Sequence, residues 1–180
     1  MIPVVIGSSA GGPKTLKKLL SGVDILRVPL IVAQHNLSSE VESFAKWIEI
    51  ETGKKVVLVK DRELLRPGIV YLPVKDRDIV LAGGEVVRVV EPGGRITPSI
   101  DRLFESAAFY LKDRAVAIVL GGLGRDGVMG AKRIAESGGR IIVQSDPEFE
   151  YLPEQVSKEV ERVAKRSLDE IILILRTMVG

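Results

Sequence analysis

The chain contains no cysteine among its 180 residues. This absence excludes disulfides, thiolate-ligated metal sites and cysteine nucleophiles, and it leaves serine as the leading candidate for a nucleophile. It also fits a reducing compartment, so we expect a cytoplasmic protein. Histidine is nearly absent too, since His35 is the only one. A mechanism that needs an imidazole base must therefore use His35.

Long apolar runs and a strong charge imbalance are also missing. No apolar stretch approaches the roughly 20 residues that a membrane-spanning helix needs, and residues 1–3 lead directly into an apolar run instead of forming a signal peptide. The formal charge of +2 is too small to indicate nucleic-acid binding. We therefore expect no membrane insertion and no nucleic-acid partner.

The composition indicates one globular domain covering residues 1–180. Hydrophobic residues make up 46% and charged residues 28% of the chain, as in ordinary globular proteins. The length suits a single domain with a substantial core, and the sequence has neither an internal repeat nor a low-complexity linker.

The pattern of apolar runs predicts a doubly wound α/β fold, with a mainly parallel sheet and helices on both faces. Short runs rich in valine and isoleucine predict buried strands at 4–6, 30–33, 56–59, 70–72, 115–120 and 140–143. Helical patterns lie between or after them at 14–20, 40–51, 99–111, 127–137 and 168–178. Residues 79–82 and 86–90 flank Gly83-Gly84-Glu85 and predict an antiparallel hairpin at a sheet edge.

Three residues mark expected helix boundaries. Pro98 is expected in a first helical turn, where its missing N–H is not needed. Gly53 and Gly138 are expected just past helix ends, in the left-handed conformation that favours glycine.

The most informative motif is Gly7-Ser8-Ser9-Ala10-Gly11, which follows the first apolar run and precedes a helical pattern. In a tight strand-to-helix turn, small flanking residues let a serine hydroxyl project above the sheet as a nucleophile. The helix N-terminus then offers unpaired N–H groups to an oxyanion. The same turn also suits a phosphate, or no ligand at all. The segment lacks the glycine spacing of a dinucleotide site and the Gly-Lys-Ser/Thr ending of a P-loop, which disfavours a nucleotide.

Two further polar residues follow apolar runs. His35 comes after the second run, and Asp126 lies in a glycine-rich turn after the most apolar one. Because the carboxyl ends of parallel strands meet at one edge, a serine, His35 and Asp126 can form a catalytic triad there. Each residue also has a simpler interpretation. A histidine at a strand end can cap that strand or bind a partner, and an aspartate before a helix is commonly an N-cap.

Together with further motifs, these residues indicate a family: the sequence resembles the catalytic domain of the chemotaxis protein-glutamate methylesterases, known as CheB, over nearly its whole length. The carrying motifs are Ile6-Gly7-Ser8-Ser9-Ala10-Gly11-Gly12-Pro13, Ala33-Gln34-His35, Pro67-Gly68-Ile69-Val70-Tyr71-Leu72, Pro98-Ser99-Ile100-Asp101-Arg102-Leu103-Phe104 and Leu120-Gly121-Gly122-Leu123-Gly124-Arg125-Asp126-Gly127. The resemblance places the nucleophile at Ser9, the general base at His35 and the orienting carboxylate at Asp126. It implies that Ser8 is dispensable.

Four residues are expected around the reacting carbonyl. Backbone N–H groups near Ala10 and in the turn at Leu123 and Gly124 are expected to receive the oxyanion. Arg125 is expected either to face an acidic substrate or to be a solvated turn residue.

The resemblance implies a serine esterase that hydrolyses glutamate γ-methyl esters on the cytoplasmic signalling helices of methylated chemoreceptors, and that also deamidates glutamine. Neither a metal nor an organic cofactor is required. Family members commonly carry an N-terminal receiver domain. Residues 1–180 contain none, so we expect such a domain to act in cis from a longer chain or in trans.

Several loops depart from the family pattern. Asn36-Leu37-Ser38-Ser39-Glu40 replaces the usual Met-Pro-Pro-Gly-Phe, residues 73–78 lack the family's histidine, and Phe149-Glu150-Tyr151-Leu152-Pro153 is shortened and altered. These departures keep two alternatives open, a non-catalytic signalling interaction domain and an esterase with a different small substrate.

Overall fold

The computed structural model describes residues 1–179. The strands of its main sheet are β1 (Val4–Ser8), β2 (Leu30–Gln34), β3 (Lys55–Val59), β5 (Ile69–Pro73), β8 (Val116–Val119), β9 (Arg140–Gln144) and β10 (Ala164–Arg166). The helices are α1 (Gly12–Gly22), α2 (Val41–Thr52), α3 (Ile100–Leu111), α4 (Val128–Glu136), α5 (Tyr151–Glu159) and α6 (Leu168–Thr177), with 3-10 turns at Ser38–Glu40 and Lys112–Arg114.

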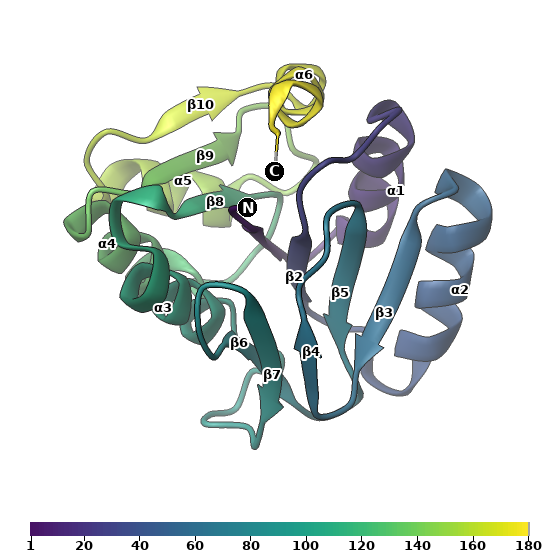
Figure 1. Ribbon diagram of the computed structural model, residues 1–180. Coiled ribbons are helices and arrows are strands. Elements are labelled where there is room, and N and C mark those ends of the chain that lie inside the picture. Colours follow the sequence, from purple (N-terminus) through teal and green to yellow (C-terminus); the bar gives the residue numbers. More distant parts are fainter. Residues whose placement is uncertain (180) are drawn as a thin grey trace.

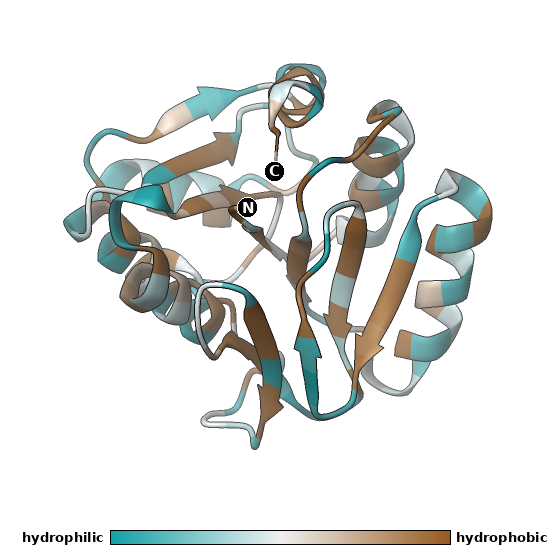
Figure 2. Ribbon diagram, viewed as in Figure 1, coloured by the Kyte–Doolittle hydropathy of each residue, from teal (hydrophilic) through white to brown (hydrophobic). Residues whose placement is uncertain are grey.

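The seven strands of the main sheet are all parallel, in the order β10-β9-β8-β1-β2-β5-β3 (Figure 1). Helices α1, α2 and α6 cover one face, and α3, α4 and α5 cover the other. Central strands are buried on both faces, and Figure 2 shows them as mostly hydrophobic. The predicted doubly wound α/β fold is therefore confirmed.

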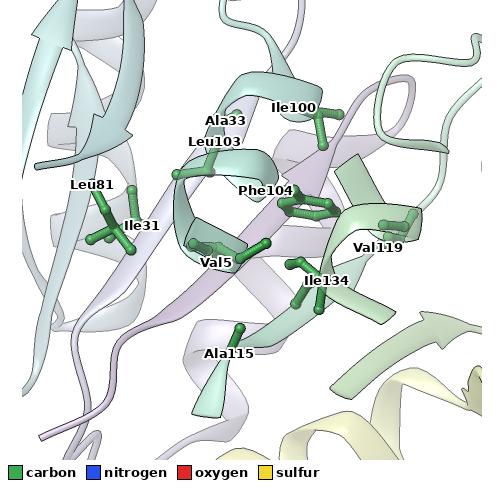
Figure 3. Packing of buried hydrophobic residues seen from close by; sticks show 14 of the residues in the cluster. Val5, Ile31, Ala33, Leu81, Ile100, Leu103, Phe104, Ala115, Val119 and Ile134 are labelled. Atoms are coloured by element: carbon green, nitrogen blue, oxygen red, sulfur yellow. The ribbon is translucent and has the colours of Figure 1, made fainter. Parts of the chain in front are cut away.

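Alternate residues along the central strands build two separate apolar cores. In β1, Val5 faces the α3 side, whereas Val4 and Ile6 face the α1 side. On the α3 side, the fully buried Phe104 packs among residues of the sheet and of α4, including Ile134 (Figure 3). Because α3 is held in this core along its length, its N-terminus has a fixed position above the carboxyl edge of the sheet.

The predicted hairpin forms, but it does not extend the main sheet. Strands β6 (Asp78–Leu81) and β7 (Val86–Val90) pair antiparallel, and β7 also pairs with β4 (Arg62–Leu64) in a separate three-stranded sheet. The apolar side of β6 packs against α3, and the Leu81 N–H donates to Ser106 Oγ of that helix at 2.9 Å. Because the hairpin packs on α3, it forms part of a separate sheet and lacks the predicted pairing with an edge strand of the main sheet.

Three elements were not predicted, and one boundary was wrong. Strands β4 and β10 are short and mostly polar (Figure 2), and α5 carries Pro153 in its first turn, where no N–H donor is lost. Pro98 does not lie in a helical turn: Ser99 is the N-cap of α3, its Oγ accepting from the Arg102 N–H at 3.1 Å, and Pro98 precedes it. Gly53 (φ 71°) and Gly138 (φ 82°) have the expected left-handed conformations.

Across residues 1–179, no helix combines the length and the apolar character needed to cross a membrane.

Candidate active site

Ser9 lies in the tight turn between β1 and α1. Gly11 caps α1 with φ 76°, a conformation that favours glycine, and the Gly12 N–H closes the turn on the Ser9 carbonyl at 2.9 Å. Gly7 is required for a different reason, because a Cβ there would overlap the Ile100 side chain of α3. The glycines of the motif therefore serve both the turn and the close approach of α3.

The two neighbouring hydroxyls differ in accessibility. Ser8 is fully buried, and its Oγ has no hydrogen-bond partner among residues 1–179. Ser9 is 8% exposed. Of the two, only Ser9 is open to a substrate.

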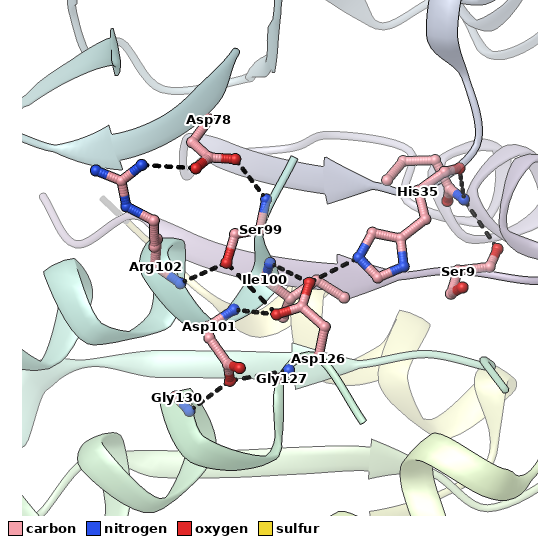
Figure 4. Close-up of polar contacts among 11 residues, drawn as sticks. Ser9, His35, Asp78, Ser99, Ile100, Asp101, Arg102, Asp126, Gly127 and Gly130 are labelled. Atoms are coloured by element: carbon pink, nitrogen blue, oxygen red, sulfur yellow. Dashed lines mark hydrogen bonds and ion pairs between the residues drawn. The ribbon is translucent and has the colours of Figure 1, made fainter. Parts of the chain in front are cut away.

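His35 and Asp126 meet at the carboxyl edge of the sheet, although they lie far apart in the sequence (Figure 4). His35 follows the last residue of β2, and Asp126 lies in the loop between β8 and α4. His35 Nε2 lies 2.7 Å from Asp126 Oδ2, and both side chains are largely buried. A short contact with little water around it is the type that fixes the orientation and tautomer of an imidazole.

Asp126 is also bound by backbone N–H groups of α3. It accepts from Ile100 at 2.7 Å and from Asp101 at 2.9 Å (Figure 4). Burial alone would raise the pKa of Asp126, but the hydrogen bonds from His35 and from these two N–H groups outweigh burial and lower the pKa. The carboxylate is thus ionised at neutral pH, so it accepts a proton-bearing Nε2.

The imidazole of His35 lies between Asp126 and Ser9, and Nδ1 is turned away from Asp126 toward the Ser9 side (Figure 4). No hydrogen bond joins Ser9 Oγ to the ring within the described part of the chain. With the proton on Nε2, Nδ1 has a free lone pair and can accept a proton. The structure therefore brings the three expected residues to one place, in the order Ser9, His35 and Asp126.

The expected oxyanion groups lie in the two turns beside Ser9. The N–H groups of Ala10 and Leu123 donate no hydrogen bond within residues 1–179. The Ser9 N–H is already bound to the Gly121 carbonyl at 3.1 Å, and the Gly122 N–H to the Phe149 carbonyl at 2.9 Å. Ala10 and Leu123 are therefore two of the donors beside Ser9 that are free to bind a developing negative charge.

Leu123, Gly124 and Arg125 form the exposed rim of the site. Arg125 is held along α5 by Glu159 at 2.7 Å and by Gln155 at 3.1 Å. An open depression of about 430 Å³ lies beside Asp126, and its lining includes Ile96, Met129 and Arg125. Arg125 thus borders the depression, while its guanidinium is anchored to a helix.

Two polar residues of the site were missed by sequence reasoning. Asp101 Oδ1 accepts from the Gly127 N–H at 2.9 Å and from the Gly130 N–H at 2.7 Å. Burial, together with the nearby Asp126 charge, raises the pKa of Asp101 to about 6, although these two N–H bonds lower it. Gln34 Nε2 donates to the carbonyls of Ser9 and His35. The sequence feature that could have indicated Gln34 is its amide at the end of an otherwise apolar strand.

Comparisons with known proteins identify the family of the chain. The family model described as CheB methylesterase matches residues 4–175. A protein-glutamate methylesterase/protein-glutamine glutaminase of Saccharophagus degradans is 35% identical over 142 residues, covering 77% of this chain and 39% of the relative. A protein of the same name from Vibrio cholerae is 29% identical, covering 92% of this chain and 48% of the relative. The chain thus spans less than half the length of these curated relatives.

The fold also matches a solved structure. The crystal structure of the Thermotoga maritima CheB methylesterase catalytic domain superposes with a TM-score of 0.86 at 26% identity, covering 99% of this chain and 98% of that one. The match therefore includes both the main sheet and the small antiparallel sheet. On the family match and the shared fold, this chain belongs to the CheB methylesterase family.

Proposed function

We propose that the chain is a serine esterase that hydrolyses glutamate γ-methyl esters on the cytoplasmic helices of chemoreceptors, with Ser9 as nucleophile, His35 as base and Asp126 as orienting carboxylate. The observation that carries the proposal is the buried 2.7 Å contact between His35 and Asp126 at the sheet edge where Ser9 lies. The names of the relatives support the substrate, and they extend the proposal to glutamine deamidation.

In the first step, His35 Nδ1 takes the Ser9 proton as Oγ attacks the ester carbonyl. The carbonyl oxygen becomes negative and is bound by the free N–H groups of Ala10 and Leu123. The positive imidazolium is stabilised by the ionised Asp126. Collapse of the intermediate expels methoxide, which leaves as methanol with the proton from His35.

In the second step, a water molecule gives its proton to His35 and attacks the acyl-Ser9 ester. The proton then returns to Ser9, and the glutamate carboxyl group leaves. With a glutamine side chain the same sequence releases ammonia instead of methanol. All protons move between Ser9, His35, water and the leaving group, so the cycle needs no metal or organic cofactor.

The open form of the site suits an ester that projects from a folded helix. Met129 and Arg125 line the depression beside Asp126, and the exposed Leu123 and Gly124 lie in the turn just before Arg125. Such a substrate places the enzyme in the cytoplasm. Because the relatives are much longer than the matched region, a receiver domain acting in cis or in trans belongs to the same proposal.

The test is methanol release from membranes that contain methylated chemoreceptors, combined with covalent labelling by a serine-directed phosphonate. The wild-type chain is expected to release methanol and to be labelled at Ser9, whereas Ser9→Ala is expected to do neither. Labelling without methanol release would indicate an esterase with another substrate. Absence of both would indicate a non-catalytic interaction domain.

A further inference from the structure

The hydrogen-bond ladder of the sheet stops one residue short of the catalytic pair. Strands β1 and β2 are in parallel register, with Ser8 opposite Gln34, and the His35 N–H still donates to the Ser8 carbonyl at 3.0 Å. Beyond this point the two chains leave the sheet. The next residues, Ser9 and His35, have no backbone hydrogen bond to each other within the described chain. The N–H groups of both residues are held by backbone bonds, that of His35 to Ser8 and that of Ser9 to Gly121, whereas no backbone bond within residues 1–179 joins their carbonyl ends.

The side chain of Gln34 spans this gap. Its Nε2 donates to the Ser9 carbonyl at 2.9 Å and to the His35 carbonyl at 2.9 Å. One amide nitrogen thereby joins the main chain of the nucleophile to the main chain of the base. An –NH₂ group has two donors, so both are used, and no carboxylate or apolar side chain of similar size can replace them.

The amide is confined on its other side. Gln34 is 1% exposed, and its Oε1 faces Gly12, where a Cβ would overlap both Oε1 and Ser8 Oγ. The Oε1 atom has no hydrogen-bond partner among residues 1–179. The amide is therefore held by its two donor bonds and by the close approach of Gly12.

We propose that Gln34 is a positioning residue: its Nε2 fixes the main-chain separation of Ser9 and His35, and thereby the distance between Ser9 Oγ and the imidazole. This inference rests on the proposed function of Ser9 and His35. Because misplacement of reacting groups by about 1 Å can lower a rate by about 100-fold, loss of this bridge is expected to reduce the chemical step more than substrate binding.

The decisive variant is Gln34→Met, which preserves volume and removes both donors. Its matched control is Gln144→Met, because Gln144 ends the parallel strand β9, is 4% exposed, and contacts Asp146 instead of the catalytic residues. For Gln34→Met we expect phosphonate labelling of Ser9 and kcat to fall about 10- to 100-fold, with KM nearly unchanged, at a temperature where the protein is fully folded. Gln144→Met is expected to keep the wild-type values.

A second variant, Gln34→Glu, separates hydrogen bonding from packing. A carboxylate would face two carbonyl oxygens, whereas a protonated carboxyl group donates to one of them. The ratio of the Gln34→Glu rate to the wild-type rate is therefore expected to rise as the pH falls. This ratio decides the question even if Gln34→Met does not fold.

His35 also provides a readout that does not require activity. As the only histidine, it gives a single imidazole in a protein labelled with ¹⁵N-histidine. We expect Gln34→Met to shift the His35 ring resonances and Gln144→Met to leave them in place. Wild-type-like labelling and unshifted resonances for Gln34→Met, or a pH-independent ratio for Gln34→Glu, would overturn the proposal. If the wild-type chain is not labelled and releases no methanol, the proposed esterase function is refuted instead. The His35 ring resonances of Gln34→Met then still test whether Gln34 positions His35.

Discussion

Asp126 binds the N-terminus of α3, the helix that carries Asp101, and Asp101 binds the N-terminus of α4, the helix that follows Asp126. Asp126, which precedes α4, accepts from the first two N–H groups of α3, and Asp101, in the first turn of α3, accepts from N–H groups at the start of α4. Both carboxylates lie at the positive ends of helix dipoles, which favour negative charge. The exchange ties α3 and α4 together at the site, so the carboxylate facing His35 is held by two helices instead of one loop.

The Asp126→Asn variant is expected to lose activity far beyond its loss of stability. An amide cannot both accept from Nε2–H and balance the imidazolium, so kcat for methanol release should fall about 10³- to 10⁴-fold. Weaker bonds to the α3 N–H groups should cost about 1–2 kcal/mol in the free energy of unfolding. The control is Asp146→Asn, because Asp146 accepts from the Leu168 N–H at 2.9 Å at the start of α6, outside the site. A kcat within about tenfold of wild type for Asp126→Asn would exclude the triad role.

The Asp101→Asn variant is expected to change how stability depends on pH. The folded-state pKa of about 6 lies above the unfolded value near 4, so the folded protein binds more protons between these pH values. This contribution to stability is fully present below about pH 4 and is lost as the pH rises through about 6. Asn stays neutral and still accepts from Gly127 and Gly130.

Relative to Asp101→Asn, the wild-type chain should therefore lose about 1 kcal/mol between pH 4.5 and pH 7, allowing for the partial exposure of Asp101. Urea unfolding of both proteins at the two pH values measures the difference. Asp126, whose pKa is lowered, stays ionised across this window. An equal stability difference at both pH values would mean that Asp101 titrates as it does in the unfolded chain.

The Gly12→Ala variant is expected to displace the Gln34 amide. The added Cβ would overlap Gln34 Oε1 and Ser8 Oγ, so these two buried side chains must shift to make room. Overpacking of this kind typically costs about 1–3 kcal/mol, and displacement of the amide should reduce phosphonate labelling of Ser9 at least about tenfold. Gly84→Ala is the control, because a Cβ there has no neighbour within 4 Å. Labelling at the wild-type rate would show that Gln34 absorbs the extra methyl group without moving its Nε2.

The Ser8→Ala variant is expected to keep its activity within about twofold of wild type, since Ser8 is closed to substrate. Removing a buried hydroxyl without a partner should leave the free energy of unfolding unchanged or raise it by about 1 kcal/mol. Mass spectrometry of the phosphonate adduct identifies the labelled serine. An adduct on Ser8 would reverse the assignment.

The sequence predicted the parts of the fold that depend on continuous apolar runs. Central strands such as β1 and β2 are buried on both faces, so their composition alone marks them. It did not predict β4 or β10, whose three residues are mostly polar and gain their partners only from the folded sheet. The hairpin was predicted from local turn chemistry, but its packing on α3 depends on contacts that are distant in the sequence.

The same limit applies to the site. Ser9, His35 and Asp126 were predicted as site residues because each follows an apolar strand, and the structure places them at one edge of the sheet. The expectation that an aspartate before a helix caps that helix did not anticipate the exchange with Asp101, because only the packing of α3 on α4 brings the two N-termini together. Gln34 was recorded only as part of a motif, since a bridge between two carbonyls has no sequence pattern of its own.

The order of strands in the main sheet also has a consequence for folding. Strands β1, β2, β3 and β5 form one side of the sheet from the first part of the chain, and β8, β9 and β10 form the other side from the later part. During synthesis, Ser9 and His35 can therefore reach their places before Asp126 has left the ribosome. Ser9 and His35 remain without Asp126 until the second side docks on β1, so the proposed esterase activity should be among the last properties to appear in refolding.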